Sequence, residues 1–138
     1  PRQLDVSLLA SRTRRLLREL GHARSELALS LVADEEIKAL NRTWRGRSRS
    51  TDVLSFSLLE GEHAGHRAGL LGDVVIGLEV ARKQAARRHR SLDEEVSRLT
   101  IHGVLHLLGY DHEKSEETRV MRSEERRLWA VIREAGKR

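Results

Sequence analysis

The chain contains no cysteine, which excludes disulfide bonds and thiolate metal sites. Any metal that it holds must therefore sit on nitrogen and oxygen ligands. The chain also lacks an apolar run approaching the ~18 residues that a membrane span requires. Its first residues show no export signal, in which basic residues precede an apolar run. These absences predict a soluble, cytoplasmic protein that does not bind a membrane.

Charged residues, in contrast, are abundant. They make up 34% of the chain, and 26 lysines and arginines against 21 acidic residues give a net charge of +5. The isoelectric point is about 10.4, so we expect an acidic partner, with nucleic acid the first candidate. With 138 residues, 38% of them hydrophobic, the chain is long enough for one domain over residues 1–138 with a packed core.

The spacing of the apolar residues predicts strands and helices in the first part of the chain, followed by three helices. Alternation with period two predicts strands at residues 4–8, 27–32, 51–56 and 70–76. Helical spacing and capping residues predict helices at about 11–20, 34–42, 78–89, 92–108 and 116–135. The glycine-containing stretch 59–69 is typical of a mobile loop. The expected fold class is α+β, a small four-stranded mixed sheet with about five helices packed against it.

The segment from His102 to His112 spaces three imidazoles in the way that metal ligands are spaced. His102 and His106 lie four residues apart, which puts them on one face of a helix. Gly109 can take the left-handed conformation that ends a helix and turns the chain back, so that His112 joins the other two. Three imidazoles plus a water are the catalytic form of a zinc site. We therefore expect one zinc ion per chain on His102, His106 and His112.

The helix that carries the first two histidines is apolar on most of its surface. Its polar stripe consists of Glu95, Arg98, His102 and His106, and such a stripe on a buried helix must face a cavity, a ligand or a partner. Asp111 lies directly before the last histidine. It can bind the metal, orient a histidine or act as a general base, and it can equally be an ordinary turn residue.

The spacing His-x-x-x-His-x-x-Gly-x-x-His is also that of the zincin-like metzincin proteases. Those enzymes carry a glutamate directly after the first histidine, and this glutamate is the base that activates water. Here the residue is Gly103, which cannot accept a proton. No Met-turn is evident either, since the only methionine, Met121, lies in the apolar row of the last helix. A zinc metallopeptidase is therefore the alternative and not the first hypothesis.

An arginine-rich segment precedes the third predicted strand. Arg42, Arg45, Arg47 and Arg49 flank Trp44. The planar guanidinium group suits phosphate, and Trp44 can stack on a base or simply pack. A second basic cluster can extend an RNA path, although a solvated helix face is the simpler explanation. This cluster consists of Arg82, Lys83, Arg87, Arg88 and Arg90.

Together these segments resemble the YbeY family, the metal-dependent endoribonucleases that mature bacterial ribosomal RNA. The histidine segment 102–112 carries the most specific match. The supporting stretches are 41–46, 50–56 and 71–76, and all four occur in the family's order and approximate spacing. Good matching covers about residues 34–135. Two departures are Ser57, where the family commonly has proline, and Trp44, where tyrosine is common.

The resemblance implies a zinc ion on the three histidines and an Arg45 that is needed for activity through contact with RNA phosphate. It implies an endoribonuclease specific for single-stranded RNA that processes ribosomal RNA, at the 3′ end of 16S rRNA, and acts in ribosome quality control. The small ribosomal subunit and an assembly GTPase are the implied partners. The nucleophile, a water or the 2′-hydroxyl of the RNA, stays open, as does the general base, for which Asp111 is the candidate. A non-catalytic ribosome assembly factor with a structural zinc is a further alternative.

Overall fold

The computed structural model describes residues 4–57 and 69–136. A sheet of three strands lies at its centre: β1 (Glu26–Val32), β2 (Val53–Ser57) and β3 (Leu70–Gly77). The strand order is β1-β3-β2. β3 pairs with β1 in parallel and with β2 in antiparallel orientation. β2 is therefore an edge strand of this mixed sheet, and its outer edge borders the site described below.

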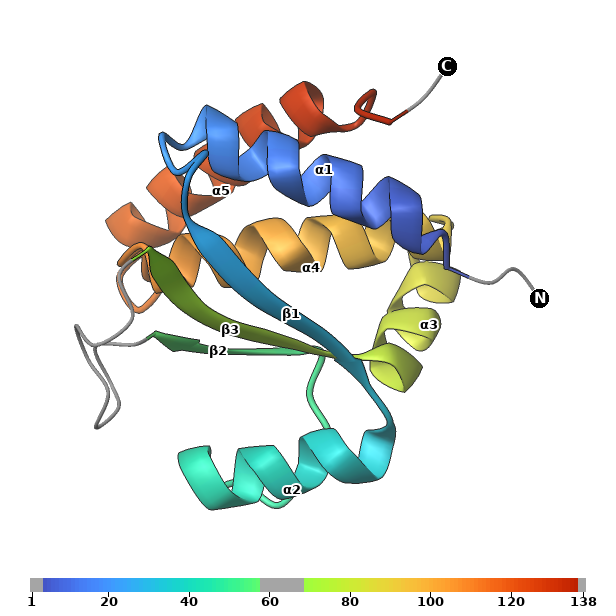
Figure 1. Ribbon diagram of the computed structural model, residues 1–138. Coiled ribbons are helices and arrows are strands. Elements are labelled where there is room, and N and C mark those ends of the chain that lie inside the picture. The colour runs from blue at the N-terminus through green and yellow to red at the C-terminus, as the bar shows by residue number, and fades with distance from the viewer. Residues whose placement is uncertain (1–3, 58–68, 137–138) are drawn as a thin grey trace.

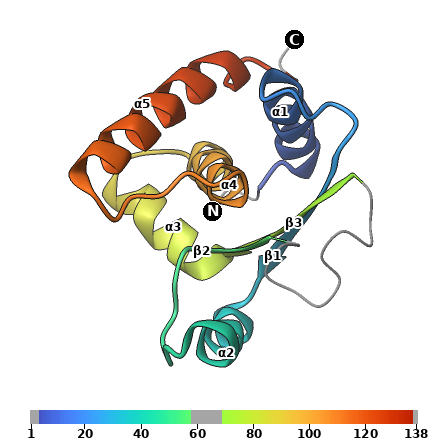
Figure 2. The same cartoon turned by 90° about the vertical axis from the view of Figure 1, so that its left-hand side faces the viewer.

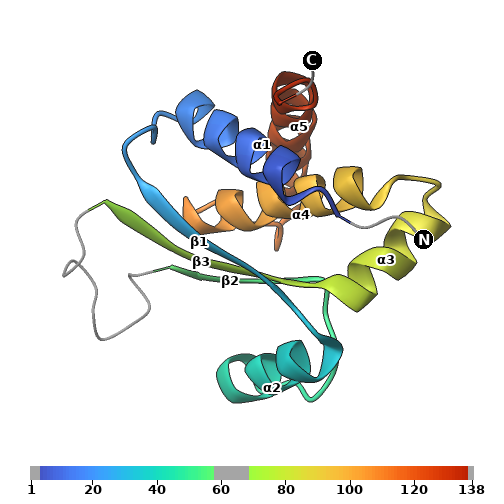
Figure 3. The same ribbon diagram turned by 45° about the vertical axis from the view of Figure 1, so that its right-hand side comes forward.

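Five helices cover the two faces of the sheet (Figure 1). One of them, α2 (Asp34–Arg45), lies alone beneath the sheet. The other face carries α4 (Leu92–Leu107), with α1 (Val6–Glu19) and α5 (Ser115–Ile132) above it (Figures 1 and 3). The fifth helix, α3 (Leu78–Arg87), follows directly on β3 and packs against α4. None of the helices described here combines the length and the apolar character that crossing a bilayer takes.

The central helix α4 is positioned by caps at both ends. Ser91 accepts a hydrogen bond from the backbone N–H of Glu94 at 3.0 Å, which satisfies one of the free amides of the first turn. At the other end, Gly109 has a φ of 100°. The N–H of Gly109 donates to the carbonyl of His106, and that of Tyr110 donates to Leu105, both at 3.0 Å. These two bonds form a Schellman motif, the turn that glycine at this position predicts.

The main core lies between the sheet and α1, α4 and α5. Nine of the sixteen residues of α4 are buried, so this helix is the centre of the apolar layer and cannot shift without disturbing its neighbours. A smaller cluster on the opposite face holds α2 against the sheet. It consists of Val32, Ile37, Leu54 and Val75.

One buried charge connects three helices. Arg12 on α1 is 4% exposed. It donates to the Ser97 hydroxyl on α4 and to the carbonyl of Arg133 after α5, both at 3.0 Å. Its guanidinium also lies 5.0 Å from the centre of the Trp129 ring on α5. Burial lowers the pKa of Arg12, and these polar and aromatic contacts offset the cost of removing the charge from water.

Two predictions about the fold are wrong and one is not tested. Residues 4–8 do not form a strand, because α1 begins at Val6, and within residues 4–57 and 69–136 the sheet has three strands and not four. Asp5 caps this helix by accepting from the N–H of Leu8 at 3.0 Å. The helix predicted at 34–42 continues to Arg45. Nearly all of the loop predicted at 59–69 lies outside the described residues.

Candidate metal centre

The three predicted ligands meet at the C-terminal end of α4. His102, His106 and His112 each offer a ring nitrogen, and these nitrogens lie within 4.8 Å of one another. The Nε2 atoms of His102 and His106 are 3.1 Å apart. Two nitrogens on a tetrahedral zinc stand roughly 3.3 Å apart, given Zn–N bonds of about 2.0–2.1 Å. The group can therefore hold a metal ion, with imidazoles as the ligands.

The Schellman turn and Asp111 bring His112 to the other two histidines. The chain reverses at Gly109, as described above. The Asp111 carboxylate then accepts a hydrogen bond from the backbone N–H of His112 at 2.7 Å. The His112 ring stacks against that of His102, with ring centres 5.7 Å apart. Asp111 thus has the geometry of a turn residue that fixes the third ligand, and its predicted role as general base stays a prediction.

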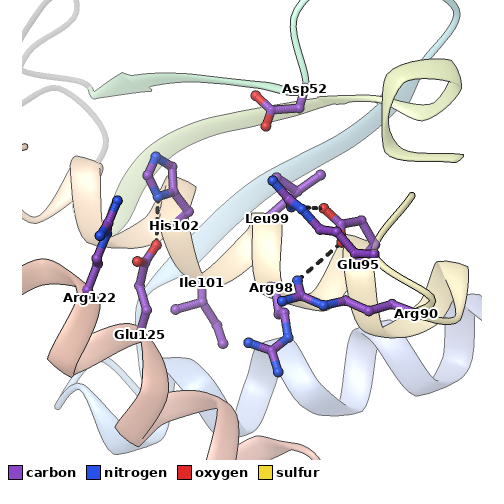
Figure 4. A pocket seen from close by; sticks show the side chains of 10 residues that line it. Asp52, Arg90, Glu95, Arg98, Leu99, Ile101, His102, Arg122 and Glu125 are labelled. Atoms are coloured by element: carbon purple, nitrogen blue, oxygen red, sulfur yellow. Dashed lines mark hydrogen bonds and ion pairs between the residues drawn. The ribbon is translucent and has the colours of Figure 1, made fainter. Parts of the chain in front are cut away.

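Sequence reasoning missed a fourth residue of the centre, Glu125 on α5. Its carboxylate lies 2.6 Å from Nδ1 of His102 (Figure 4). A carboxylate at this distance accepts a hydrogen bond from Nδ1–H, and in the neutral ring this tautomer keeps Nε2, the nitrogen that faces His106, as the free donor for a metal. Histidines that bind metals usually have such a partner. Only the fold brings Glu125 to this position, since it lies thirteen positions after His112 in the sequence.

His106 is the ligand whose pKa responds to its surroundings. Burial, and then the neighbouring imidazoles of His102 and His112, lower its pKa below the usual value for histidine. A histidine with a lowered pKa is neutral at physiological pH, and only the neutral ring can donate its lone pair to a metal. The surroundings of His106 therefore favour ligation without any competing proton near pH 7.

The histidines line a cleft of about 410 Å³ whose other wall is the edge strand β2. Arg45, the last residue of α2, lines the same cleft. Its Nη2 donates to the carbonyl of Ser55 at 2.8 Å, and its guanidinium lies 4.7 Å from the centre of the Phe56 ring. The structure thus brings Arg45 to the cleft of the histidines, although it lies 57 positions before His102 in the sequence.

A second hollow of about 470 Å³ adjoins the cleft and shares His102 and Asp52 with it (Figure 4). The polar stripe predicted on α4 separates here into the two histidines and two residues held in ion pairs. Glu95, 0% exposed, is neutralised by Arg88 at 2.8 Å and Arg90 at 3.3 Å. Arg98 binds Glu94 at 2.8 Å. Of the four residues of the stripe, only His102 and His106 belong to the metal group. Arg88 and Arg90, two members of the second basic cluster, pair with the buried Glu95 and so have a structural role.

A comparison with known proteins agrees with this geometry. The family model of endoribonuclease YbeY matches residues 4–133. The chain belongs to the YbeY family. The resemblance predicted from the histidine segment is confirmed, and the match extends back to residue 4, beyond the residues 34–135 in which the sequence itself matches well.

Relatives with the name endoribonuclease YbeY match most of the chain. The one from Anaeromyxobacter sp. (strain Fw109-5) is 44% identical over 135 residues, which cover 93% of this chain and 69% of the relative. The YbeY protein of Syntrophotalea carbinolica is 40% identical, with 96% and 89% covered. A solution structure, TM1509 from Thermotoga maritima, has the same fold, with a TM-score of 0.59 at 24% identity over 96% of this chain and 88% of that one.

Proposed function

We propose that this YbeY-family chain is a zinc-dependent endoribonuclease that cuts single-stranded RNA during ribosomal RNA processing. The observation that carries the proposal is the convergence of three imidazoles and one arginine in a single cleft. Family membership supports the nuclease class. The 3′ end of 16S rRNA as the target, a part in ribosome quality control, and the small subunit and an assembly GTPase as partners belong to the same proposal.

Zinc is the metal that these ligands favour. The chain offers neutral nitrogen donors, and three protein ligands leave one position of a tetrahedral ion for water or substrate. Bound in this group, zinc supplies a water of lowered pKa and offsets negative charge on a phosphate. Glu125 fixes the ring of His102, and Asp111 fixes the turn that carries His112. Both residues therefore position metal ligands, and neither needs RNA to do so.

We infer that Arg45 binds the scissile phosphate. Its charge stands at the rim of the cleft that the histidines line. A phosphate that enters the cleft would meet Arg45 and, with a metal on the three histidines, a second cation, and such charges would stabilise charge growing on phosphorus. Asp111 remains our candidate for the general base. In Asp111→Asn the amide oxygen can still accept the hydrogen bond from the His112 N–H, so the turn is kept. The same substitution removes the carboxylate that could act as the base.

The packing of Gly103 argues against a peptidase. A Cβ atom at this position would lie 2.7 Å from a methyl group of Val74, and the Gly103 carbonyl accepts from the Ser55 hydroxyl at 2.9 Å. Position 103 therefore faces the sheet, and the catalytic glutamate of the metzincins has no room there. Arg45 also occupies the Ser55 carbonyl on β2, which a substrate strand added to this edge would need.

The test is the coupling of metal content to RNA cleavage. We expect purified protein to carry close to one zinc per chain and to cut a single-stranded oligonucleotide. His106→Ala should lose the zinc and the cleavage while circular dichroism shows a folded chain. The matched control is His22→Gln, whose ring contacts Ser25 away from the cleft, and it should retain both properties.

Each contrary result selects a different alternative. Cleavage that persists in His106→Ala points to a contaminating nuclease and refutes the assignment. Bound zinc without any cleavage favours the non-catalytic assembly factor, and digestion of casein would favour the peptidase. The termini of the products identify the nucleophile, because attack by the 2′-hydroxyl leaves a cyclic phosphate and attack by water does not.

A further inference from the structure

Trp44 is an exposed aromatic side chain next in sequence to Arg45, which lines the metal cleft. It is 64% exposed, whereas the second tryptophan, Trp129, is 8% exposed. Isolated exposed hydrophobic residues are common and need no function. Trp44 differs from Val6 and Val120, the other large hydrophobic residues that are exposed in the described chain, because of what surrounds it.

Phe56 connects Trp44 to the cleft. The two rings meet edge to face, with centres 6.3 Å apart and planes at 67°. The Arg45 guanidinium lies over the same Phe56 ring at 4.7 Å, and Arg45 lines the cleft with the histidines. The contact with Phe56 orients the indole but leaves most of its surface in water. One phenyl ring therefore supports both an exposed indole and the cation at the rim.

The end of α2 that carries Trp44 lies on the same side of the molecule as the end of α4 that carries the histidines. The C-terminal ends of α2 and α4 lie on the same side of the molecule in Figure 1, and Figure 2 faces that side, with α4 above the sheet and α2 below it. Trp44 is the last residue but one of α2. Arg42, Arg47 and Arg49 near it are exposed as well. An exposed π face among cations suits a nucleobase and its phosphates better than an apolar partner.

We propose that Trp44 is a stacking platform for one unpaired base of the RNA strand whose adjacent phosphate enters the metal cleft. The proposal rests on the proposed endoribonuclease function and adds a specificity device to it. A base within a duplex is already stacked on both faces and cannot lie on the indole, so the platform selects single strands. Stacking does not depend on base identity, so it selects strandedness without selecting sequence.

The first test measures binding through the fluorescence of the protein itself. The probe is a six-nucleotide 2′-O-methyl oligoadenylate, which attack by the 2′-hydroxyl cannot cleave, titrated briefly into the protein as purified. We expect quenching of Trp44 emission, with the buried Trp129 as a constant background. Trp44→Phe should remove the quench and keep part of the affinity, and Trp44→Ala should bind about 10-fold more weakly. Val120→Ala, also exposed, should bind as the wild type does.

The second test locates the base. Oligonucleotides that lack one base at a defined position should lose affinity for the wild-type protein only when the gap lies next to the cleavage site. Trp44→Ala should bind the whole series equally. In cleavage assays this variant should raise KM about 10-fold and change kcat little, because stacking binds the ground state and the transition state alike.

Contrary outcomes separate this proposal from the one on which it rests. If wild-type protein cuts RNA and Trp44→Ala binds within twofold of it, the platform is refuted and the endoribonuclease stands. A blue shift of Trp44 emission with lipid vesicles but no response to RNA would make the residue a membrane contact and refute the platform. Wild-type protein that neither binds nor cuts RNA refutes both proposals.

Discussion

At the residue scale, the contact between Glu125 and His102 joins a side chain of α5 directly to a ligand ring of the metal centre. We predict that Glu125→Gln lowers zinc affinity by about 10- to 100-fold, the usual effect of losing a ligand's hydrogen-bond partner. The amide still accepts the Nδ1 proton, but it lacks the charge that makes the imidazole a stronger donor. Competition with a chromophoric chelator measures the affinity, and ¹⁵N NMR of the His102 ring reports its tautomer.

Glu124 provides a matched control one residue away. Its carboxylate binds Arg127 at 2.7 Å, and that hydrogen bond lowers the pKa of Glu124. Glu124→Gln therefore removes the same charge from the same turn of α5 without touching a histidine, and zinc affinity should stay within twofold of the wild type. Equal losses in the two variants would show that the net charge of the helix, and not the contact with His102, determines affinity.

The lowered pKa of His106 predicts how the stability of the metal-free protein changes in acid. Its pKa is lowered in the folded state, chiefly by burial, so below pH ~6.5 the unfolded chain takes up a proton that the folded chain resists. Stability contributed by the neutral ring should be complete above that pH and should fall as the pH decreases toward the folded-state pKa. Urea unfolding of chelated protein at several pH values between 7.5 and 5 measures this slope. His106→Gln should flatten it.

At the scale of the element, Gly103 determines how closely α4 approaches the sheet. We predict that Gly103→Ala lowers the free energy of unfolding by about 1–3 kcal/mol, the usual cost of overpacking a core. The added methyl group would lie 2.7 Å from Val74, and the gain in helix propensity of about 1 kcal/mol offsets only part of the strain. Urea denaturation followed by circular dichroism measures the change.

A substitution on the solvated face of α5 is the control for this prediction. Arg119 binds only Glu116 among the described residues, and both side chains are more than 70% exposed. Arg119→Ala should therefore change the unfolding free energy by less than about 0.5 kcal/mol. A Gly103→Ala protein as stable as this control would mean that α4 can move away from β3, contrary to the packing described here.

Most elements follow from the sequence because each has its own local signals. Ser91 and Gly109 mark the two ends of α4, and the strand predicted at 70–76 differs from β3 by a single residue. The first element was predicted wrongly because five alternating residues satisfy a strand and a helix equally well. Asp5 decides between them as an N-cap, in favour of a helix whose buried face includes Leu9 and Leu16.

The candidate site was predictable where one short segment carries it. The spacing of the three histidines is enough to predict that they lie together, because the helix and the glycine turn that bring them together are both determined by local sequence. Glu125 was not predicted, since its contact depends on how α5 crosses α4. A signal does exist: Glu125 lies one helical turn after the buried Met121 and one before the buried Trp129. An acidic residue within an apolar row of a helix is a candidate partner for a buried cation or ligand.

At the scale of the whole molecule, charge and fold act on the same ligand. The net charge of +5 attracts RNA from any direction, whereas the cleft combines Arg45 with all three histidines. Binding should therefore have a general electrostatic part, shared among many arginines and screened by salt, and a local part that depends on Arg45 and the metal. The salt dependence of affinity separates the two.

We predict that RNA affinity falls steeply with salt and that Arg45→Ala makes this slope shallower by about 0.7, the contribution of one phosphate contact on a single strand. Fluorescence titration at several potassium chloride concentrations measures the slope for each variant, and Arg119→Ala, with its charge already paired on α5, should leave it unchanged. An unchanged slope in Arg45→Ala, together with weaker binding, would mean that Arg45 holds the edge of β2 through Ser55 and does not contact phosphate.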